Sequence, residues 1–305
     1  MFIKKIKKII TRIIKKIFIE EFEKNLILKG KLLSSKNKKI KKIKDLSDVE
    51  FRIFSQWGED GIIDWIISQI PGISKNFLEI GTEDYQESNT RFLLINRNWD
   101  GFLIDSDQDA IKKIKSQRLY WKYNLKAFSA FLTTKNINKI ISDLKLPKKI
   151  GLISLDIDGV DYWILKKIKK LNPTIFICEY NSIFGINKCF TVPDKEKFLR
   201  KKEHYSNLYY GASIKAFIDL LKDEYIFLGT NSSGNNAFFI KKEHKKFIKN
   251  KIRNYTIFES KFRESRNYEN KLTYLNKKKS RLLLKNKDII DLNKKEKLKF
   301  KNIQL

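Results

Sequence analysis

Between residues 50 and 243 the apolar positions follow two alternating patterns, one typical of helices and one typical of strands. Apolar residues three or four apart predict amphipathic helices, and short apolar runs bounded by turn residues predict buried strands. The predicted helices cover residues 58–70, 88–97, 108–117, 136–144, 160–170 and 212–222. The predicted strands cover residues 76–81, 101–105, 118–124, 150–156, 174–180, 225–230 and 236–241. This alternation indicates an α/β fold, in which helices cover both faces of a mostly parallel sheet.

The last two predicted strands are joined by the short turn Asn231–Asn236. A connection of that length allows only antiparallel pairing. The sequence therefore predicts a mostly parallel sheet that closes with a C-terminal antiparallel hairpin.

Residues 2–19 predict a basic amphipathic helix, with Ile and Phe on one face and Lys and Arg on the other. The lysines interrupt the apolar run that a signal peptide needs. The pattern fits binding to an anionic membrane surface, and it also fits a helix docked on its own domain or on a partner protein. The Lys-, Ser- and Asn-rich residues 31–47 predict a tether.

Most of the net charge of +30 falls near the two ends, whereas the centre is nearly balanced. We therefore predict a basic helix and tether (1–49), an α/β domain (50–243) and a basic C-terminal extension (244–305). Lys and Asn are abundant throughout, so the total charge is poor evidence for nucleic-acid binding. Nucleic acid is an unlikely partner also because the central domain concentrates carboxylates where a ligand would enter.

Two cysteines, Cys178 and Cys189, cannot form a disulfide framework, and two histidines make zinc chemistry improbable. No apolar run reaches the roughly 18 residues of a spanning helix. We expect a cytoplasmic protein, peripheral on the inner face of the membrane if the N-terminal helix binds lipid.

Acidic residues end the first two predicted strands of the central domain. Glu79 and Gly81 close the first strand and Asp105 closes the second. Ligands of open α/β sheets bind at the carboxyl ends of the strands, where a glycine admits a cofactor and a carboxylate holds ribose hydroxyls. These residues predict a nucleoside cofactor. In the alternative, Glu79 accepts hydrogen bonds from the segment at Ser88, and Asp107, a further cofactor candidate, caps the next helix.

A second acidic group follows the fourth and fifth strands. Strand alternation puts Asp156 and Asp158 on one side, facing the cleft, and Glu179 ends the neighbouring strand beside the acceptor pocket. Asp158 and Glu179 are our candidate catalytic residues, because one carboxylate raises the pKa of another and so creates a general base. Asp156 and Asp158 also suit a divalent metal ion. Helix capping is the alternative, and we assign it to Asp161.

Four motifs in register resemble those of the FkbM-type methyltransferases. The resemblance covers about 190 residues and leaves out both flanks. The motifs are Ser55-Gln-Trp-Gly-Glu-Asp60, Phe77-Leu-Glu-Ile-Gly-Thr-Glu-Asp84, Ser88-Asn-Thr90 and Trp99-Asp-Gly-Phe-Leu-Ile-Asp105, with a looser match at Leu155-Asp-Ile-Asp-Gly-Val-Asp161.

This resemblance implies a class I methyltransferase-like (Rossmann-like) fold with seven strands that binds S-adenosylmethionine. It implies that Glu79 and Gly81 line the methionine and ribose side and that Asp105 holds the ribose. Gln56 of the first motif would close over the cofactor, or merely lie beside a helix start. The chain departs from the family at Tyr85, where a glycine is usual, and at Asp105-Ser106, where Glu-Pro is usual.

The predicted activity is O-methylation of a sugar or other small hydroxylated acceptor, which becomes a lipid-linked glycan if the N-terminal helix binds a membrane. A metal-dependent glycosyltransferase is one alternative, because Asp156 and Asp158 resemble a metal-binding aspartate pair. A non-catalytic membrane or nucleic-acid adaptor with a degenerate cofactor site is the other.

Overall fold

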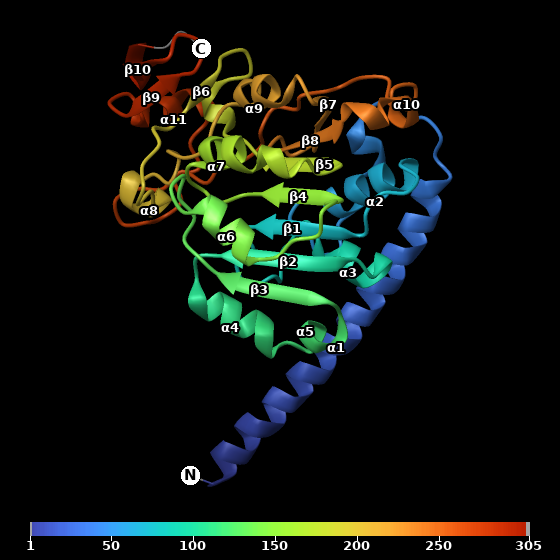
Figure 1. Cartoon of the computed structure of the whole chain (residues 1–305). Coiled ribbons are helices and arrows are strands. Elements are labelled where there is room, and N and C mark those ends of the chain that lie inside the picture. The colour runs from blue at the N-terminus through green and yellow to red at the C-terminus, as the bar shows by residue number, and fades with distance from the viewer. Residues whose placement is uncertain (1, 303–305) are drawn as a thin grey trace.

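The computed structural model describes residues 2–302, except for the side chains of residues 2–17, 19 and 302. Its centre is a seven-stranded sheet with the strand order β3-β2-β1-β4-β5-β8-β7 (Figure 1). These strands are β1 (Asn76–Ile80), β2 (Asp100–Asp105), β3 (Leu125–Ser129), β4 (Leu152–Leu155), β5 (Ile175–Glu179), β7 (Tyr225–Thr230) and β8 (Asn236–Lys241). The first five are mutually parallel, and β8 pairs antiparallel with both β5 and β7. The predicted fold class is confirmed.

The order of the strands reverses between β1 and β4, because the chain first builds the sheet outward through β2 and β3 and then returns. In open α/β sheets such a switch point leaves a crevice at the carboxyl ends of the two central strands. The predicted ligand residues of β1 and β4 therefore end at the position where the topology itself favours a ligand.

Helices cover both faces of the sheet, as predicted. Apolar residues of α2, α3, α4 and α5 pack in one buried cluster, and those of α6, α7 and α9 pack in the other. Their bounds are α2 (Glu59–Gln69), α3 (Arg91–Arg97), α4 (Gln108–Ser116), α5 (Arg118–Lys122), α6 (Ile137–Asp143), α7 (Asp161–Ile168) and α9 (Ile214–Leu221), with 3-10 turns η1 (Leu46–Val49), η2 (Lys169–Leu171) and η3 (Ser182–Phe184). The sheet and these helices form a rigid frame for the strand ends.

The predicted strand at 118–124 is wrong. Residues 118–122 form the short helix α5, and the strand begins only at Leu125. Aromatic residues favour strands, but only Leu119 is buried within α5, whereas Leu125 and Ala127 alternate into the core and pair with β2. Core packing therefore overrides local propensity here.

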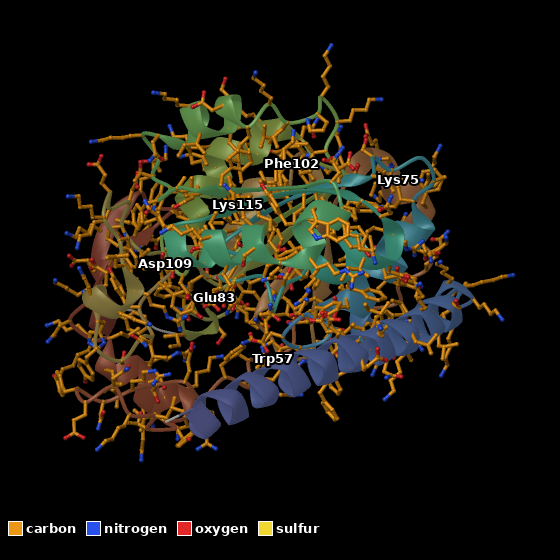
Figure 2. All side chains as sticks on the ribbon, turned by 90° about the horizontal axis from the view of Figure 1, so that it is seen from below. Trp57, Lys75, Glu83, Phe102, Asp109 and Lys115 are labelled. Carbon is orange, nitrogen blue, oxygen red and sulfur yellow. The ribbon has the colours of Figure 1, made fainter. Side chains whose placement is uncertain are left out.

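The predicted tether is also wrong. Helix α1 (Phe2–Lys38) continues through residues 31–38, and it lies along one side of the α/β core (Figures 1 and 2). Asn37 donates to the carbonyl of Val49 at 2.7 Å, which fixes the end of the helix. Leu46 and Val49 are buried beyond it. The polar composition of this segment reflects a docked helix with a solvated face.

The C-terminal residues add a second, small antiparallel sheet, with the order β10-β9-β6, that the sequence did not predict. Ile252 joins one apolar cluster, and Leu284, Ile289 and Phe300 join the other, so the basic C-terminal segment packs into the core. Its elements, with those of the loop before α9, are β6 (Phe190–Thr191), α8 (Arg200–Glu203), η4 (Lys242–His244), α10 (Lys245–Ile248), α11 (Lys277–Leu283), β9 (Asp288–Asp291), β10 (Glu296–Lys299) and η5 (Phe300–Asn302). Across the described residues, every helix is too short or too polar to cross a bilayer.

Candidate active site

Acidic side chains of four strands share one face at the carboxyl edge of the sheet. Ile80 pairs with Ile104 on one side and with Leu155 on the other. Because side chains alternate along a strand, this register puts Glu79 on the same face as Asp105, the last residue of β2, and Asp156, the residue after β4. Glu179 continues the row on β5, opposite Asn236 of β8. The sequence prediction that carboxylates converge on this edge is supported by the register.

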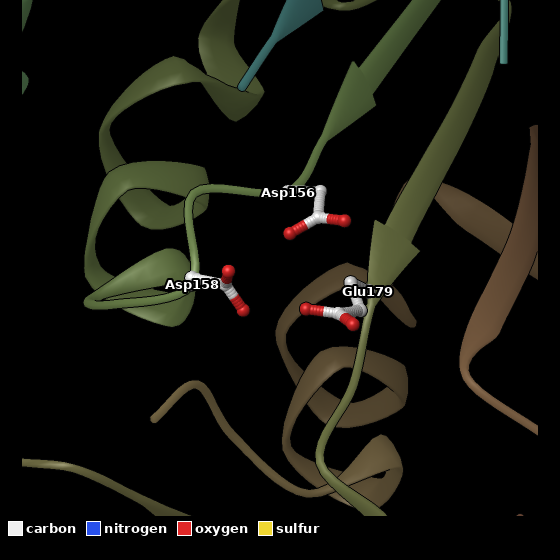
Figure 3. A group of neighbouring side chains, drawn as sticks. All are labelled: Asp156, Asp158 and Glu179. Atoms are coloured by element: carbon white, nitrogen blue, oxygen red, sulfur yellow. The ribbon is translucent and has the colours of Figure 1, made fainter. Parts of the chain in front are cut away.

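Asp156, Asp158 and Glu179 form a compact carboxylate cluster, and we use this name for the three residues below. One carboxylate oxygen from each lies within 4.8 Å of the others. Figure 3 shows the loop after β4 carrying Asp156 and Asp158 toward Glu179 at the end of β5. Within the described residues the buried Oε2 of Glu179 has no hydrogen-bond partner. A buried acceptor without a donor is costly, so this atom is available to a ligand.

Burial and mutual repulsion change the protonation of the cluster. Burial, followed by the charges of Asp158 and Asp161, raises the pKa of Asp156 well above its ordinary range. Burial and the charge of Asp156 likewise raise the pKa of Glu179. Two carboxylates this close cannot both ionise without a compensating cation, so the pair retains a proton under conditions where ordinary carboxylates have lost theirs.

Arg200 supplies the positive charge beside the cluster. Its guanidinium donates to Asp158 and to Glu264, and it stacks on the ring of Tyr210 with 3.8 Å between its Cζ atom and the ring centroid. The arginine side chain is only 14% exposed, whereas that of Asp158 is 50% exposed. Arg200 therefore holds Asp158 from one side and leaves its other side open to solvent.

The loop that carries Asp158 is held by Asp161, which is the first residue of α7 and not the predicted helix cap. The Asp161 carboxylate accepts hydrogen bonds from the backbone N–H groups of Ile157 and Gly159, both at 2.9 Å. Burial raises the pKa of Asp161 to about 6. Asp158 itself has a φ of +52°, a region that non-glycine residues rarely occupy. The loop is thus a strained backbone turn fixed by one buried carboxylate, as is common at functional sites.

Asp105 lies where a ribose-binding carboxylate was predicted, and backbone groups already use both of its oxygens. Its Oδ2 accepts from the N–H groups of Thr82 and Glu83 at 2.8 and 2.7 Å, and its Oδ1 accepts from Asp107 at 2.8 Å. These bonds draw the loop after β1 against the end of β2. A carboxylate oxygen accepts more than one hydrogen bond, so capacity for a ribose hydroxyl remains.

Glu79 makes the hydrogen bonds to the segment at Ser88 that the structural alternative predicted. Its carboxylate accepts from the Ser88 hydroxyl at 2.7 Å, from the backbone N–H of Asn89 at 3.0 Å and from the Thr90 hydroxyl. Burial raises the pKa of Glu79, although these hydrogen bonds act to lower it. Glu79 therefore fixes the segment before α3, and it would act on a cofactor mainly by positioning the surrounding loop.

Gly81 is required by the backbone itself. Its φ is +82°, and a Cβ atom added there would lie 1.5 Å from the carbonyl oxygen of Asp156. The close approach expected of this glycine is thus to the neighbouring strand β4. Any side chain at this position would therefore clash with the backbone that follows β4.

Tyr85 adopts a positive-φ backbone conformation that favours glycine. Its φ is +62°, but its side chain is completely buried and its hydroxyl pairs with that of Thr90 at 2.9 Å. The ring packs into the core cluster on that face of the sheet and so does not enter the loop. The departure from the family pattern therefore does not obstruct the strand ends.

The first motif serves mainly to anchor a loop. Glu59 accepts from the side chains of Asn231 and Asn236, at 2.6 and 2.8 Å, and so ties this loop to the β7–β8 turn. Gln56 is exposed, and its side chain accepts from the indole of Trp57 at 2.8 Å. Asp107 caps α4 through the N–H groups of residues 109 and 110. Gln56 and Asp107 remain candidate cofactor residues, and each already has a hydrogen-bond partner within the protein.

Sequence reasoning missed Arg200, Glu264 and Glu83 at this edge. Arg200 begins the four-residue helix α8, 42 residues from Asp158 and 64 from Glu264, so no local periodicity connects the three. Burial and the charges of Asp105 and Asp158 raise the pKa of Glu83, which shows that it faces the same acidic edge. The Glu83 position, two residues after the glycine that follows β1, was the one available signal.

No family model matches the chain, and the comparison with curated proteins finds no relative. Solved structures share parts of its fold at low identity. A Bacillus cereus O-methyltransferase in complex with S-adenosylhomocysteine (SAH) is 17% identical over 58% of this chain and 78% of its own, with a TM-score of 0.36.

An S-adenosylmethionine-dependent methyltransferase from Clostridium acetobutylicum is 14% identical over 60% and 90% of the two chains, with a TM-score of 0.37. The N-terminal domain of EvdMO1 with SAH bound is 11% identical over 58% and 77%, also with a TM-score of 0.37. These values are too low to establish a shared activity.

Proposed function

We propose that this chain is an S-adenosylmethionine-dependent methyltransferase of the FkbM-like type that methylates a hydroxyl group. The observation that carries the proposal is the row of carboxylates at the β1/β4 switch point, with Asp105 on one side and the carboxylate cluster on the other. Cofactors of open α/β sheets bind at such an edge.

The residues present fit this cofactor by charge and by shape. S-adenosylmethionine carries positive charge on its sulfonium and amino groups, and the edge offers the unpaired buried oxygen of Glu179 and the half-exposed Asp158. A cation there would offset repulsion among carboxylates that burial makes costly. Asp105 would hold the ribose and Gly81 would lie beneath it. When bound, the cofactor supplies an electrophilic methyl group.

The carboxylate cluster would act on the acceptor. Burial and mutual repulsion raise the pKa values of Glu179 and Asp156, so the pair binds a proton more tightly than ordinary carboxylates do, which is what a general base for a hydroxyl needs. Arg200 holds Asp158 in place, and Asp161 fixes the loop, so the pair keeps its geometry while a proton moves. Alignment of acceptor and donor would supply most of the acceleration.

The same three carboxylates would hold a hard divalent cation, because Mg²⁺ and Mn²⁺ prefer oxygen ligands. A metal there would polarise the acceptor hydroxyl. This cluster is also the specific observation that favours the second candidate function, a metal-dependent glycosyl transfer. Binding of a uridine diphosphate sugar only when manganese is present would favour that second candidate.

Helix α1 supports the part of the proposal that concerns membranes. Phe18, Phe22 and Leu32 are 72%, 58% and 65% exposed, and the predicted membrane-binding side chains of residues 2–17 lie outside the described part. Exposed apolar residues on a basic helix suit an anionic bilayer surface. Co-sedimentation of the full chain with phosphatidylglycerol vesicles, but not with phosphatidylcholine vesicles, would support a lipid-linked acceptor. Equal binding to both, or to neither, would contradict it.

Titration calorimetry of the full chain with S-adenosylmethionine tests the central proposal. We expect saturable binding that Asp105→Asn weakens about tenfold, because a charged acceptor for two ribose hydroxyls is worth about 1–3 kcal/mol. Asp109→Asn, at a side chain that is 88% exposed, is the matched control and should bind like the native chain. Thermal unfolding should confirm that each variant is folded. Absence of saturation at millimolar cofactor would refute the proposal.

A further inference from the structure

A cavity of about 380 Å³ lies beside the end of β5, between the segment that follows this strand, the C-terminal residues 257–260 and helix α11. None of the predicted cofactor or catalytic residues lines it. Glu179 belongs to the carboxylate cluster, whereas Tyr180, the next residue, lines the cavity. Side chains of successive strand residues point to opposite faces of a sheet. The cavity is therefore separate from the candidate active site. Its lining comprises Tyr180, Ser182, Gly185, Ile186, Asn187, Lys188, Ile257, Phe258, Glu259, Ser260, Lys277 and Arg281.

Two long-range hydrogen bonds hold the walls of the cavity together. The hydroxyl of Tyr180 donates to the carbonyl of Phe258 at 3.3 Å, across 78 residues of chain. The Nε of Arg281 donates to the carbonyl of Ile183 at 3.0 Å, across 98 residues. The cavity is thus formed by tertiary contacts that place α11 against the turn after β5.

The charge of the lining is mainly positive. Lys188, Lys277 and Arg281 face a single carboxylate, Glu259, whose side chain is 78% exposed and lies 3.6 Å from Lys277. With its Nε on the wall, Arg281 retains the terminal nitrogens of its guanidinium for an anion. A guanidinium recognises phosphate oxygens in pairs, and a lysine adds a point charge.

The remaining lining suits a polyhydroxylated body. Ser182, Asn187 and Ser260 offer hydrogen-bonding groups, and Tyr180 and Phe258 belong to the apolar part of the wall. The volume lies within the range of about 300–1,000 Å³ that is usual for small-molecule pockets. A small neutral sugar would leave the excess positive charge of the lining uncompensated, because Glu259 offsets only one of the three cations. A purely apolar ligand would bury the polar groups without partners.

We propose that this cavity binds a small phosphate-bearing molecule, a phosphate ester of a sugar or similar polyhydroxylated compound. Arg281 and Lys277 bind the phosphate, Lys188 adds charge at the mouth, and the polar side chains contact hydroxyl groups. The proposal is independent of methyl transfer, because the cavity contains none of the carboxylates at the carboxyl edge of β1 and β4.

Titration calorimetry of the full chain with glucose 1-phosphate tests this proposal, with inorganic pyrophosphate and glucose as further probes. We expect saturable binding of glucose 1-phosphate, weaker binding of pyrophosphate and no detectable binding of glucose. Lys277→Gln and Arg281→Lys should each weaken glucose 1-phosphate about tenfold, the first by losing a charge and the second by losing the planar fork.

Lys112→Gln is the matched control, because this lysine is 73% exposed on α4 and pairs only with Asp109 in the described contacts. Its affinity for glucose 1-phosphate should equal that of the native chain. Absence of saturation with both phosphate probes would overturn the proposal, as would equal weakening by Lys112→Gln and Lys277→Gln, since that indicates a diffuse basic surface. Titration of the same samples with S-adenosylmethionine measures binding at the candidate active site. The two proposals can therefore fail or succeed independently.

Discussion

Asp60 should make the stability of this protein fall as the pH rises through about 6. Its Oδ2 accepts from the backbone N–H groups of Ile53, Phe54 and Ser55 at 2.7, 2.7 and 2.8 Å, and from the Ser55 hydroxyl at 3.0 Å. The residue is 2% exposed. Burial outweighs these bonds and raises the pKa of Asp60 from its ordinary 3.8 to about 6.

The sign follows from which state binds the proton more tightly. The folded chain holds the proton of Asp60 up to a higher pH than the unfolded chain, so protonation favours folding. The stabilising contribution is fully present below pH 3.8 and is lost as the pH rises through about 6. The difference between these two pKa values corresponds to about 3 kcal/mol.

Asp60→Asn removes the titration while keeping the shape of the side chain. We expect the unfolding free energy of the native chain, relative to the variant, to fall by about 3 kcal/mol between about pH 4 and pH 7. Urea denaturation followed by circular dichroism over this range measures it, with Asp109→Asn as a control for an exposed carboxylate. Asp161 has a similarly raised pKa but is present in both proteins and cancels. A difference that stays constant with pH, or grows in the opposite direction, would refute the reasoning.

Three further substitutions test the packing of the site by the same urea measurement. Gly81→Ala should cost several kcal/mol more than Gly72→Ala, because both glycines have positive φ but only an added Cβ at position 81 meets backbone; equal costs would contradict the close approach. Tyr85→Phe should cost about 1 kcal/mol through its lost hydroxyl bond, with cofactor affinity unchanged; a loss of cofactor binding would show that the ring contacts the ligand. Arg200→Gln should cost about 2 kcal/mol, because it removes charged hydrogen bonds from a guanidinium that is only 14% exposed, whereas Lys24→Gln, at a side chain that is 65% exposed, should change little; similar small effects would refute a structural role for the Arg200 ion pairs.

The central fold could be predicted because its elements are long, periodic and locally encoded. The predicted strand at 76–81 is one residue longer than β1 at its end, and the predicted helix at 58–70 is one residue longer than α2 at each end. The predictions that failed depend on distant contacts. Strand β6 has two residues and pairs with β9 about a hundred residues later, so no local pattern marks either strand. Leu125 enters the core only because β2 lies beside it.

The candidate site likewise contains some residues that could be predicted from the sequence and others that could not. Asp156 and Glu179 could be placed together because strand ends and a period of two fix where their side chains point. Asp158 joins them through the turn after β4, where its φ is +52°, and not through strand alternation. The roles of Glu79 and Asp105 were harder to predict, since loop backbone and hydroxyl groups occupy their oxygens. Arg200 could not be found from the sequence, because only the folded loops bring it to Asp158.

The charge distribution gives a physical reason to expect a ligand at this edge. The chain carries a net charge of +30, yet Glu83, Asp105 and the carboxylate cluster gather at one edge of the sheet. Burial and repulsion raise the pKa values of Asp156 and Glu179, which means that their ionised forms oppose folding at neutral pH. Amide side chains could satisfy a purely structural role without that cost. A bound cation would offset it, so a cationic cofactor or a divalent metal should raise the unfolding temperature of the native chain more than that of an Asp156→Asn variant.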